Sequence, residues 1–246
     1  MLQGKTALIT GGTSGIGFAT ARLFLKNGAR VAITGRDRQR LDQARRQLGD
    51  GILAIEADVR HRRDLQRMAD ELKTAFGTLD IVFANSGVAY ATPIETTDEA
   101  AYDELMNVNF KGVFFTVQAV LPIMRSGGSI VLNASWLNQV GTPGRSLLSA
   151  SKAAVRSLAR TLSAELLDRK IRVNAVSPGS IETPIHRRGQ NDEEYRAYRE
   201  RVAAQVPVGR MGQPDDIAAA ALFLASDASS YMLGAEIMVD GGRAEL

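Results

Sequence analysis

The segment Thr10-Gly11-Gly12-Thr13-Ser14-Gly15-Ile16-Gly17 joins a short apolar run to a helix-like stretch near the start of the chain. Its glycines suit a tight turn, a close approach of backbone N–H groups to a pyrophosphate, and close packing of a helix on a strand. The partial positive charge at the start of the helix also favours a phosphate. Such a turn can equally be a plain connection, so the rest of the chain decides between the two interpretations.

Short apolar runs rich in β-branched residues alternate with helix-like stretches along the whole chain. The runs lack strict polar alternation, as is typical of strands buried on both faces of a parallel sheet. Strands are expected at Thr6–Thr10, Val31–Thr34, Ile52–Ile55, Ile81–Ala84, Ile130–Leu132, Ile171–Val176 and Ile237–Val239. Helices are expected at Gly15–Asn27, Arg38–Leu48, Asp64–Phe76, Thr97–Met124, Ser149–Leu167 and Pro214–Ala225. This order predicts an α/β fold: a Rossmann-type doubly wound parallel sheet of about seven strands, with helices on both faces.

Composition narrows the class of protein. Of 246 residues, 45% are hydrophobic and 23% are charged, as in folded soluble proteins. The formal net charge is +3 with basic and acidic residues interleaved, so we expect no nucleic-acid partner. The absence of cysteine excludes disulfides and thiolate ligands, and no metal site is predicted. No run approaches the ~18 apolar residues of a membrane span, so we expect one cytoplasmic domain over residues 1–246.

One polar segment, Ile185–Arg201, interrupts the pattern between the last two expected strands. It is rich in charged residues and contains two tyrosines. We expect a surface lid over about residues 184–205. The alternative is a solvated helical excursion that touches no ligand.

The glycine-rich loop, read as T-G-x-x-x-G-I-G, resembles the cofactor loop of the short-chain dehydrogenase/reductase family. The resemblance extends over essentially all 246 residues and includes Asp58-Val59, Ala84-Asn85-Ser86-Gly87 and Pro178-Gly179-Ser180-Ile181-Glu182-Thr183, in the family's order. It implies a nicotinamide cofactor, a small-molecule substrate and a homotetramer. The cofactor-binding residues are then Gly11, Thr13, Ser14, Gly15, Ile16, Gly17, Arg36, Asp58, Val59, Asn85, Gly87, Lys152, Pro178, Gly179, Ile181 and Thr183.

The end of the second expected strand, Gly35-Arg36-Asp37, bears on the choice of cofactor. A carboxylate at this point accepts hydrogen bonds from the ribose 2′-hydroxyl of NAD, whereas a guanidinium accommodates the 2′-phosphate of NADP. Gly35 occupies the expected acidic position and Arg36 follows it. The sequence therefore favours NADP(H) over NAD(H), although Asp37 keeps NAD(H) open.

The resemblance also implies a catalytic set, and one member of that set is replaced. Asn109, Ser135 and Lys152 stand where the family has its asparagine, serine and lysine. The family's tyrosine, which exchanges a proton with the substrate oxygen, precedes the lysine by four residues, and this chain has Leu148 there. That spacing puts two side chains on one face of a helix. Leucine carries no such proton, and loss of a positioned acid costs roughly 10²- to 10⁴-fold in rate.

Three interpretations of Leu148 stay open. The substrate needs no acid at this position, as for a cationic iminium or a conjugated C=C bond; or another group supplies the proton; or the protein is catalytically weak. The candidates for the second interpretation are Ser135, Ser149, Tyr90, His186 and a water held by Asn109 and Lys152. Trp136 and Asn138 are expected on the substrate side, because they follow the carboxyl end of a strand.

We therefore predict an NADP(H)-dependent oxidoreductase that transfers hydride between nicotinamide and a small carbonyl, imine or activated alkene, at an atypical site without the tyrosine. The alternative is a weak or inactivated nucleotide-binding relative, either natural or an engineered variant in which Leu148 replaced a tyrosine.

Overall fold

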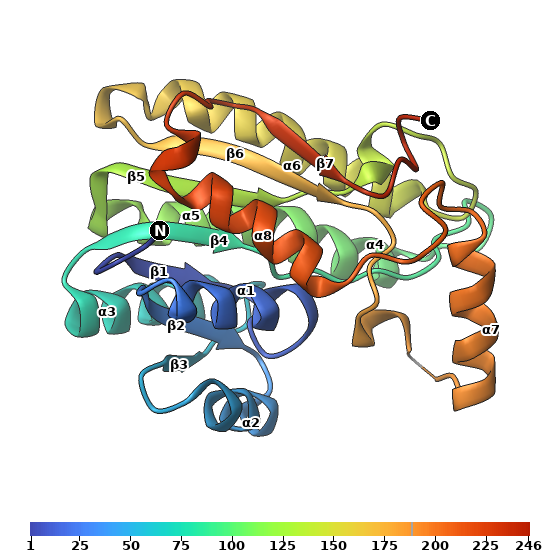
Figure 1. Cartoon of the computed structure of the whole chain (residues 1–246), viewed down its shortest axis with the longest axis horizontal. Helices are drawn as coiled ribbons and strands as arrows, with labels where there is room; N and C mark the ends of the chain where they lie inside the picture. Colours follow the sequence, from blue (N-terminus) through green and yellow to red (C-terminus); the bar gives the residue numbers. More distant parts are fainter. Residues whose placement is uncertain (188) are drawn as a thin grey trace.

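The computed structural model describes residues 1–187 and 189–246, without the side chain of His186. Within them, seven strands form one parallel sheet in the order β3-β2-β1-β4-β5-β6-β7 (Figure 1). The strands are β1 (Thr6–Ile9), β2 (Arg30–Gly35), β3 (Leu53–Glu56), β4 (Leu79–Ala84), β5 (Met124–Asn133), β6 (Arg172–Pro178) and β7 (Glu236–Val239). The chain thus winds outward from β1 to β3, then returns to continue from β4 to β7, which confirms the expected doubly wound topology.

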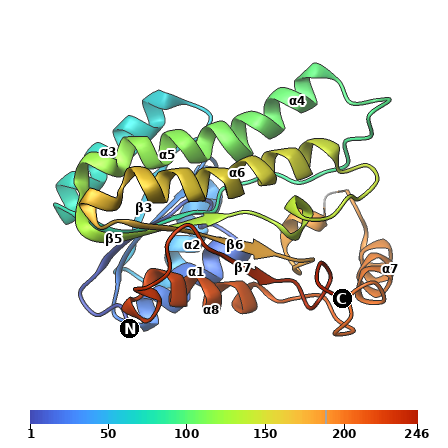
Figure 2. The same ribbon diagram turned by 90° about the horizontal axis from the view of Figure 1, so that it is seen from above.

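Helices cover both faces of the sheet (Figure 2). They are α1 (Gly15–Lys26), α2 (Arg38–Leu48), α3 (Arg62–Phe76), α4 (Glu99–Met106), α5 (Gly112–Val120), α6 (Ser146–Glu165), α7 (Asp192–Ala203) and α8 (Pro214–Ala225). One apolar core packs α3, α5 and α6 on the sheet, and a second packs α1, α2 and α8 on the opposite face. Every residue of β1, β4 and β6 is buried, which explains why these strands lack an alternation of polar and apolar residues.

The single helix expected over residues 97–124 is confirmed only in part, because the helical segment begins at Glu99 and is not a regular α-helix throughout. The structure has α4, a π-helical turn at Asn107–Lys111, α5 and a 3₁₀ turn at Leu121–Ile123. In the π-helical turn the Gly112 N–H donates to the carbonyl of Asn107, five residues back. Single π-turns of this kind often occur at functional sites, and this one contains Asn109.

The expected lid contains a 3₁₀ turn at Pro184–His186 and helix α7, which projects beyond the edge of the sheet (Figure 1). Asn191 caps α7: its side chain accepts from the Glu194 N–H at 2.9 Å, and the Glu194 carboxylate accepts from the Asn191 N–H at 2.9 Å. This reciprocal pair stabilises the start of a helix that has few buried residues of its own. Among the described residues, no helix is long and apolar enough to cross a membrane.

Candidate active site

One cleft, with a volume of about 760 Å³, opens at the carboxyl ends of β1, β2 and β4. Its walls come from the glycine-rich loop, the ends of these strands and the segment that follows β6. The cofactor residues expected from the sequence that line it are Gly11, Thr13, Ser14, Gly15, Ile16, Arg36, Asp58, Val59, Asn85, Gly87 and Thr183. Residues from distant parts of the chain therefore gather around one space large enough for a nucleotide.

The glycine-rich loop has a backbone that side chains would obstruct. Gly11 and Gly15 have φ values of 65° and 53°, in the left-handed region that glycine adopts without strain. A Cβ on Gly17 would lie 2.3 Å from the carbonyl oxygen of Gly11. The Ser14 side chain makes no capping bond to α1, so the first N–H groups of that helix stay available to an anion. These residues fit the diphosphate of a dinucleotide.

The remaining expected cofactor residues support the walls of the cleft from behind. Gly179 lies against β7, where an added Cβ would be 2.5 Å from the Cα of Asp240. Pro178 ends β6, and Ile181 is buried and forms an isolated bridge with Gly212. The chain then turns to Thr183, whose methyl group would lie 3.0 Å from a Cβ on Gly15. The segment after β6 thus closes over the start of α1.

At the end of β2, the Asp37 carboxylate is already engaged. It caps α2 by accepting from the Arg40 N–H at 3.1 Å, and its other oxygen lies 3.7 Å from Arg40 Nε. Arg36 lines the cleft, is exposed, and has no ion pair in the described part of the chain. A Cβ on Gly35 would lie 2.6 Å from the Thr13 methyl group, so a carboxylate-bearing side chain at position 35 has no room unless Thr13 moves.

Asp58, on the far wall of the cleft, is held by its neighbour Arg60. The Arg60 guanidinium donates to both carboxylate oxygens, at 3.0 and 2.6 Å. Hydrogen bonding from Arg60 lowers the pKa of Asp58 despite partial burial, so this carboxylate stays ionised. Val59 beside it packs on Gly112, where a Cβ would lie 2.8 Å from Val59 Cγ2.

Lys152 lies on the buried face of α6, near the lining residue Gly87. Its ammonium donates to the carbonyl of Asn133 at 2.6 Å, and a Cβ on the lining residue Gly87 would be 3.8 Å from Nζ. Burial lowers the pKa of Lys152 to about 8, because the charged form loses its hydration. An ammonium has three N–H donors, so this bond leaves two of them for other partners.

Asn109 forms hydrogen bonds to the loop after β4 and to helix α6. Its side-chain oxygen accepts from the Val88 N–H at 2.8 Å, and its amide nitrogen donates to the Val88 carbonyl at 2.9 Å and to Ser151 Oγ at 3.4 Å. Ser151 Oγ in turn donates to the Leu148 carbonyl. Both N–H donors of the Asn109 amide and its oxygen therefore make hydrogen bonds that hold the wall of the cleft next to Gly87.

Ser135 and Leu148 occupy the positions expected to face the acceptor. Ser135 follows β5, and its hydroxyl oxygen accepts from the Leu137 N–H at 3.3 Å, which leaves the hydroxyl proton to donate. Leu148 is 6% exposed and belongs to the apolar core of its side of the sheet. An apolar, packed side chain thus stands one helical turn before Lys152.

The other candidates for a proton donor fall into different surroundings. The Tyr90 hydroxyl donates to the carbonyl of Ala101 at 3.0 Å and lies 3.2 Å from the Glu104 carboxylate, so it is directed at α4. Ser149 lies within the first turn of α6, beside Leu148. The side chain of His186 lies outside the described part of the structure.

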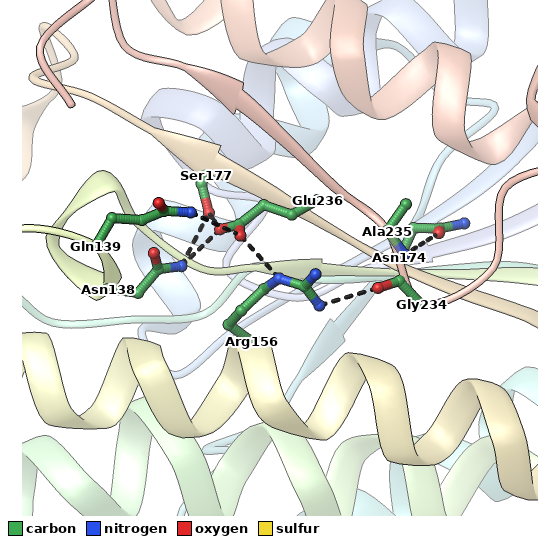
Figure 3. Close-up of polar contacts among 8 residues, drawn as sticks. All are labelled: Asn138, Gln139, Arg156, Asn174, Ser177, Gly234, Ala235 and Glu236. Atoms are coloured by element: carbon green, nitrogen blue, oxygen red, sulfur yellow. Dashed lines mark hydrogen bonds and ion pairs between the residues drawn. The ribbon is translucent and has the colours of Figure 1, made fainter. Parts of the chain in front are cut away.

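Figure 3 shows a polar network around Glu236 that the sequence analysis did not predict. The Glu236 carboxylate accepts from Arg156 Nε at 2.7 Å, from Asn138 Nδ2 at 2.6 Å and from the Ser177 hydroxyl. Arg156 also donates to the Gly234 carbonyl at 3.0 Å. Asn138, expected on the substrate side, is instead engaged in this network. The available signal was a single carboxylate, Glu236, at the start of the otherwise apolar strand β7.

Proteins similar to this chain belong to a family that binds nicotinamide cofactors, in agreement with the cleft described above. A family model described as enoyl-(acyl carrier protein) reductase matches residues 11–244. The chain belongs to the short-chain dehydrogenase/reductase family. It is 43% identical to oxidoreductase asL5 of Sarocladium schorii, over 100% of this chain and 98% of that protein. It is 37% identical to the NADP-dependent (R)-specific alcohol dehydrogenase of Lentilactobacillus kefiri, over 98% and 97% respectively.

Solved structures give the same result. A short-chain type dehydrogenase/reductase from Mycobacterium marinum matches with a TM-score of 0.91 and 32% identity, covering 100% of this chain and 97% of that one. The relatives are oxidoreductases, so a general oxidoreductase function is supported for this chain.

Proposed function

We propose that this protein is an NADP(H)-dependent oxidoreductase that acts on a small carbonyl, imine or activated alkene without a tyrosine acid. The observation that carries the proposal is the pairing of a cleft that fits a dinucleotide, with Lys152 beside its lining residue Gly87, and a buried Leu148 in the position of the acid. Each of these features constrains the chemistry separately: the first supports nicotinamide binding, and the second restricts the acceptor.

The preference for NADP(H) rests on the end of β2. Arg36 presents a guanidinium at the cleft, whereas Asp37 is used as the cap of α2. A guanidinium suits a 2′-phosphate, because its planar fork donates two parallel hydrogen bonds. The Lentilactobacillus kefiri relative is NADP-dependent, in agreement with this assignment.

The residues of the protein would bind and orient the cofactor and the acceptor. When bound, the cofactor supplies a hydride from C4 of its nicotinamide. The free hydroxyl proton of Ser135 would orient the acceptor, and the two free N–H donors of Lys152 would hold ribose hydroxyls. The segment from Pro178 to Thr183 would hold the nicotinamide carboxamide against the start of α1.

Leu148 sets which acceptors can react. A neutral ketone becomes an alkoxide on receiving a hydride and needs a proton at once, which Leu148 does not supply. A cationic iminium becomes a neutral amine and needs none. A conjugated alkene becomes an enolate on receiving a hydride, and its α-carbon can take a proton from solvent water, so no acid at position 148 is required. The apolar side chain of Leu148 is therefore compatible with a cationic iminium or a conjugated alkene as the acceptor.

We also propose that residues 1–246 form one domain and that four chains associate. All seven strands of the described residues lie in one sheet, which supports the single domain. The mass of the protein in solution tests the tetramer.

NADPH consumption against matched ketones, iminium ions and enones, run beside Leu148→Tyr, tests the proposed function. The proposal requires that the wild type consumes NADPH with an iminium ion or an enone. If only the Tyr variant turns over any acceptor, the protein is an inactivated relative. If NADPH fluorescence does not change on mixing with the protein, the cofactor assignment fails as well.

A further inference from the structure

The backbone on both sides of Arg243 is fixed by neighbouring residues of the chain. The Asp240 carboxylate accepts from the Gly242 N–H at 2.9 Å and from the Ala244 N–H at 2.7 Å. The Gly242 carbonyl accepts from the Leu246 N–H at 3.0 Å. These hydrogen bonds form a turn that sets the direction in which the Arg243 side chain leaves the backbone.

The Arg243 side chain contacts three segments that are distant from one another in the sequence. Its guanidinium carbon lies 4.3 Å from the ring centroid of Trp136. One terminal nitrogen donates to the Ser180 hydroxyl, and the other donates to the side-chain oxygen of Gln205 at 2.7 Å. A guanidinium can make all three contacts, because its N–H donors lie in one plane and the face of that plane packs on an aromatic ring.

Each of the three segments belongs to the surroundings of the site. Trp136 follows Ser135 in the turn of residues 135–138 after β5, which we call the acceptor turn. Ser180 lies just after β6, and Gln205 lies at the end of the expected lid. Between these two positions the chain lines the cofactor cleft at Thr183, Pro184, Ile185, Arg187 and Gln190. Arg243 thus joins both ends of the lid to the acceptor turn.

The acceptor turn has two anchors. The first is Asn138, whose Nδ2 donates to the Glu236 carboxylate of β7 at 2.6 Å (Figure 3). The second is Trp136, which carries Arg243 on its ring. The Ser135 hydroxyl oxygen accepts from a backbone N–H of the same turn at 3.3 Å, so the position of this hydroxyl follows that of the turn. The first anchor ties the turn to the sheet, and the second ties it to the lid.

We propose that Arg243 is a positioning residue: it holds the acceptor turn against both ends of the lid and so places the Ser135 hydroxyl relative to a cofactor in the cleft. Arg243 does not itself line the cofactor cleft, so its loss should slow hydride transfer and leave the affinity for the cofactor unchanged. The effect on hydride transfer rests on the proposed function, whereas the link between the lid and Trp136 can be measured without turnover.

Trp136 is the single tryptophan of the chain, so its emission reports directly on the acceptor turn. Arg243→Gln uncovers one face of the indole and should increase the quenching of this emission by acrylamide. NADP⁺, which unlike NADPH does not absorb the emitted light, should change the emission of the wild type by binding against the lid. In Arg243→Gln most of that change should be lost, while calorimetry gives the same Kd for NADP⁺.

Turnover gives the second measurement, with NADPH and the 1,2-dimethyl-1-pyrrolinium ion. Misplacement of a reacting group by about 1 Å can cost ~10²-fold in rate, and we expect the kcat of Arg243→Gln to fall by about tenfold or more. Arg243→Lys should not restore kcat, because an ammonium lacks the planar fork that reaches Ser180 and Gln205 from above an aromatic ring. Full rescue by lysine would mean that charge alone matters and would overturn the positioning role.

Arg30→Gln is the matched control. The Arg30 guanidinium carbon also lies on an aromatic ring, 4.8 Å from the centroid of Phe76, and Arg30 donates to the Ala75 carbonyl at 2.8 Å. Arg30 begins β2, at the opposite end of that strand from the cofactor cleft, so its loss should leave kcat and the NADP⁺ response unchanged. Urea denaturation shows whether the two variants lose comparable stability.

The inference is overturned if cofactor binds and the emission response to NADP⁺ is absent from the wild type or equal in Arg243→Gln. It is also overturned if Arg243→Gln keeps the wild-type kcat, or if Arg30→Gln loses as much. If the wild type binds NADPH but reduces no acceptor, the proposed function fails and the emission measurements alone decide whether Arg243 links the lid to the acceptor turn.

Discussion

Leu148 and Lys152 lie one turn apart on the buried face of α6 and meet opposite surroundings. Leu148 packs in the apolar core, whereas the Lys152 ammonium donates to the Asn133 carbonyl at 2.6 Å beside the cofactor cleft. Lys152 is thus a cation beside the cleft, and the side chain one turn before it on the helix carries no proton to donate.

Replacing Leu148 with tyrosine should create activity toward plain ketones. A positioned phenol beside Lys152 supplies the missing proton, and we expect kcat/KM for a small ketone to rise by roughly 10²- to 10⁴-fold. Leu148→Phe is the matched control, because it adds the ring without the hydroxyl. Each variant enlarges a side chain that is 6% exposed and should lose about 1–3 kcal/mol of stability, which urea denaturation measures. Equal ketone activity in the phenylalanine variant would refute the role of the hydroxyl.

Arg36→Gln should weaken NADPH binding and leave NADH binding unchanged. Hydrogen bonds between charged groups contribute about 1.5–3 kcal/mol, so the NADPH Kd should rise by about tenfold or more. Arg46→Gln, on the exposed surface of α2, provides the control. Fluorescence titration measures both cofactors. Tighter binding of NADH than NADPH to the wild type would reverse the cofactor assignment.

Stability should rise with pH through the titration of Lys152. The pKa of this lysine is lowered from 10.5 to about 8 by burial, so between these values the unfolded chain binds a proton that the folded protein does not. The free energy of unfolding should therefore increase by up to about 1.4 kcal/mol per pH unit from pH 8 upward, relative to Lys152→Met. Urea denaturation of both proteins at several pH values gives this difference. A difference independent of pH would show that Lys152 titrates normally in the folded protein.

Breaking the pair between Arg156 and Glu236 should destabilise the fold. Their side chains are 14% and 9% exposed, and removal of one partner leaves a buried charge unpaired, at about 3–5 kcal/mol. Arg156→Met and Glu236→Gln should each show this loss, and the double variant should lose less than the sum of the two. Double-mutant cycles in urea measure the coupling, and additive losses would mean that the two side chains do not interact.

The Glu236 carboxylate should also make the free energy of unfolding depend on pH in the acid range. Burial opposes its ionisation, but hydrogen bonds from Ser177, Asn138 and Arg156 outweigh burial and lower the pKa of Glu236 below 4.5. Its contribution is complete above pH 4.5 and should be lost as the pH falls through the lowered pKa. Glu236→Gln should remove this part of the acid sensitivity.

The fold and the cofactor cleft could be predicted because their signals are local. The glycines of residues 11–17 predict the turn between the first strand and the first helix. Apolar runs such as Ile81–Ala84 indicate strands covered on both faces of the sheet. The π-helical turn around Asn109 left no such signal, because an α-helix and a π-turn need the same kinds of residue. The hydrogen bonds between Asn109 and Val88 join residues 21 positions apart, so the sequence did not indicate them either.

The remaining parts of the site depend on contacts between distant segments. Asp37 reads as a possible ribose ligand until its bond to the Arg40 N–H assigns it to a helix cap. Arg243 reads as an ordinary residue near the end of the chain, and only the folded protein brings it to Trp136. Charge and residue type could be read from the sequence, but the partner of each charge could not.

Deuterium transfer by the wild-type protein tests whether hydride chemistry proceeds here without the tyrosine. The protein is mixed with NADPH dideuterated at C4 and with either the 1,2-dimethyl-1-pyrrolinium ion, an enone or a ketone of similar size, and the products are analysed by mass spectrometry. We predict deuterium on carbon in the amine or the reduced enone, formed at least about 10²-fold faster than any deuterated alcohol. Binding of NADPH with no deuterium in any product, or a ketone reduced as fast as the iminium ion, would refute this mechanism.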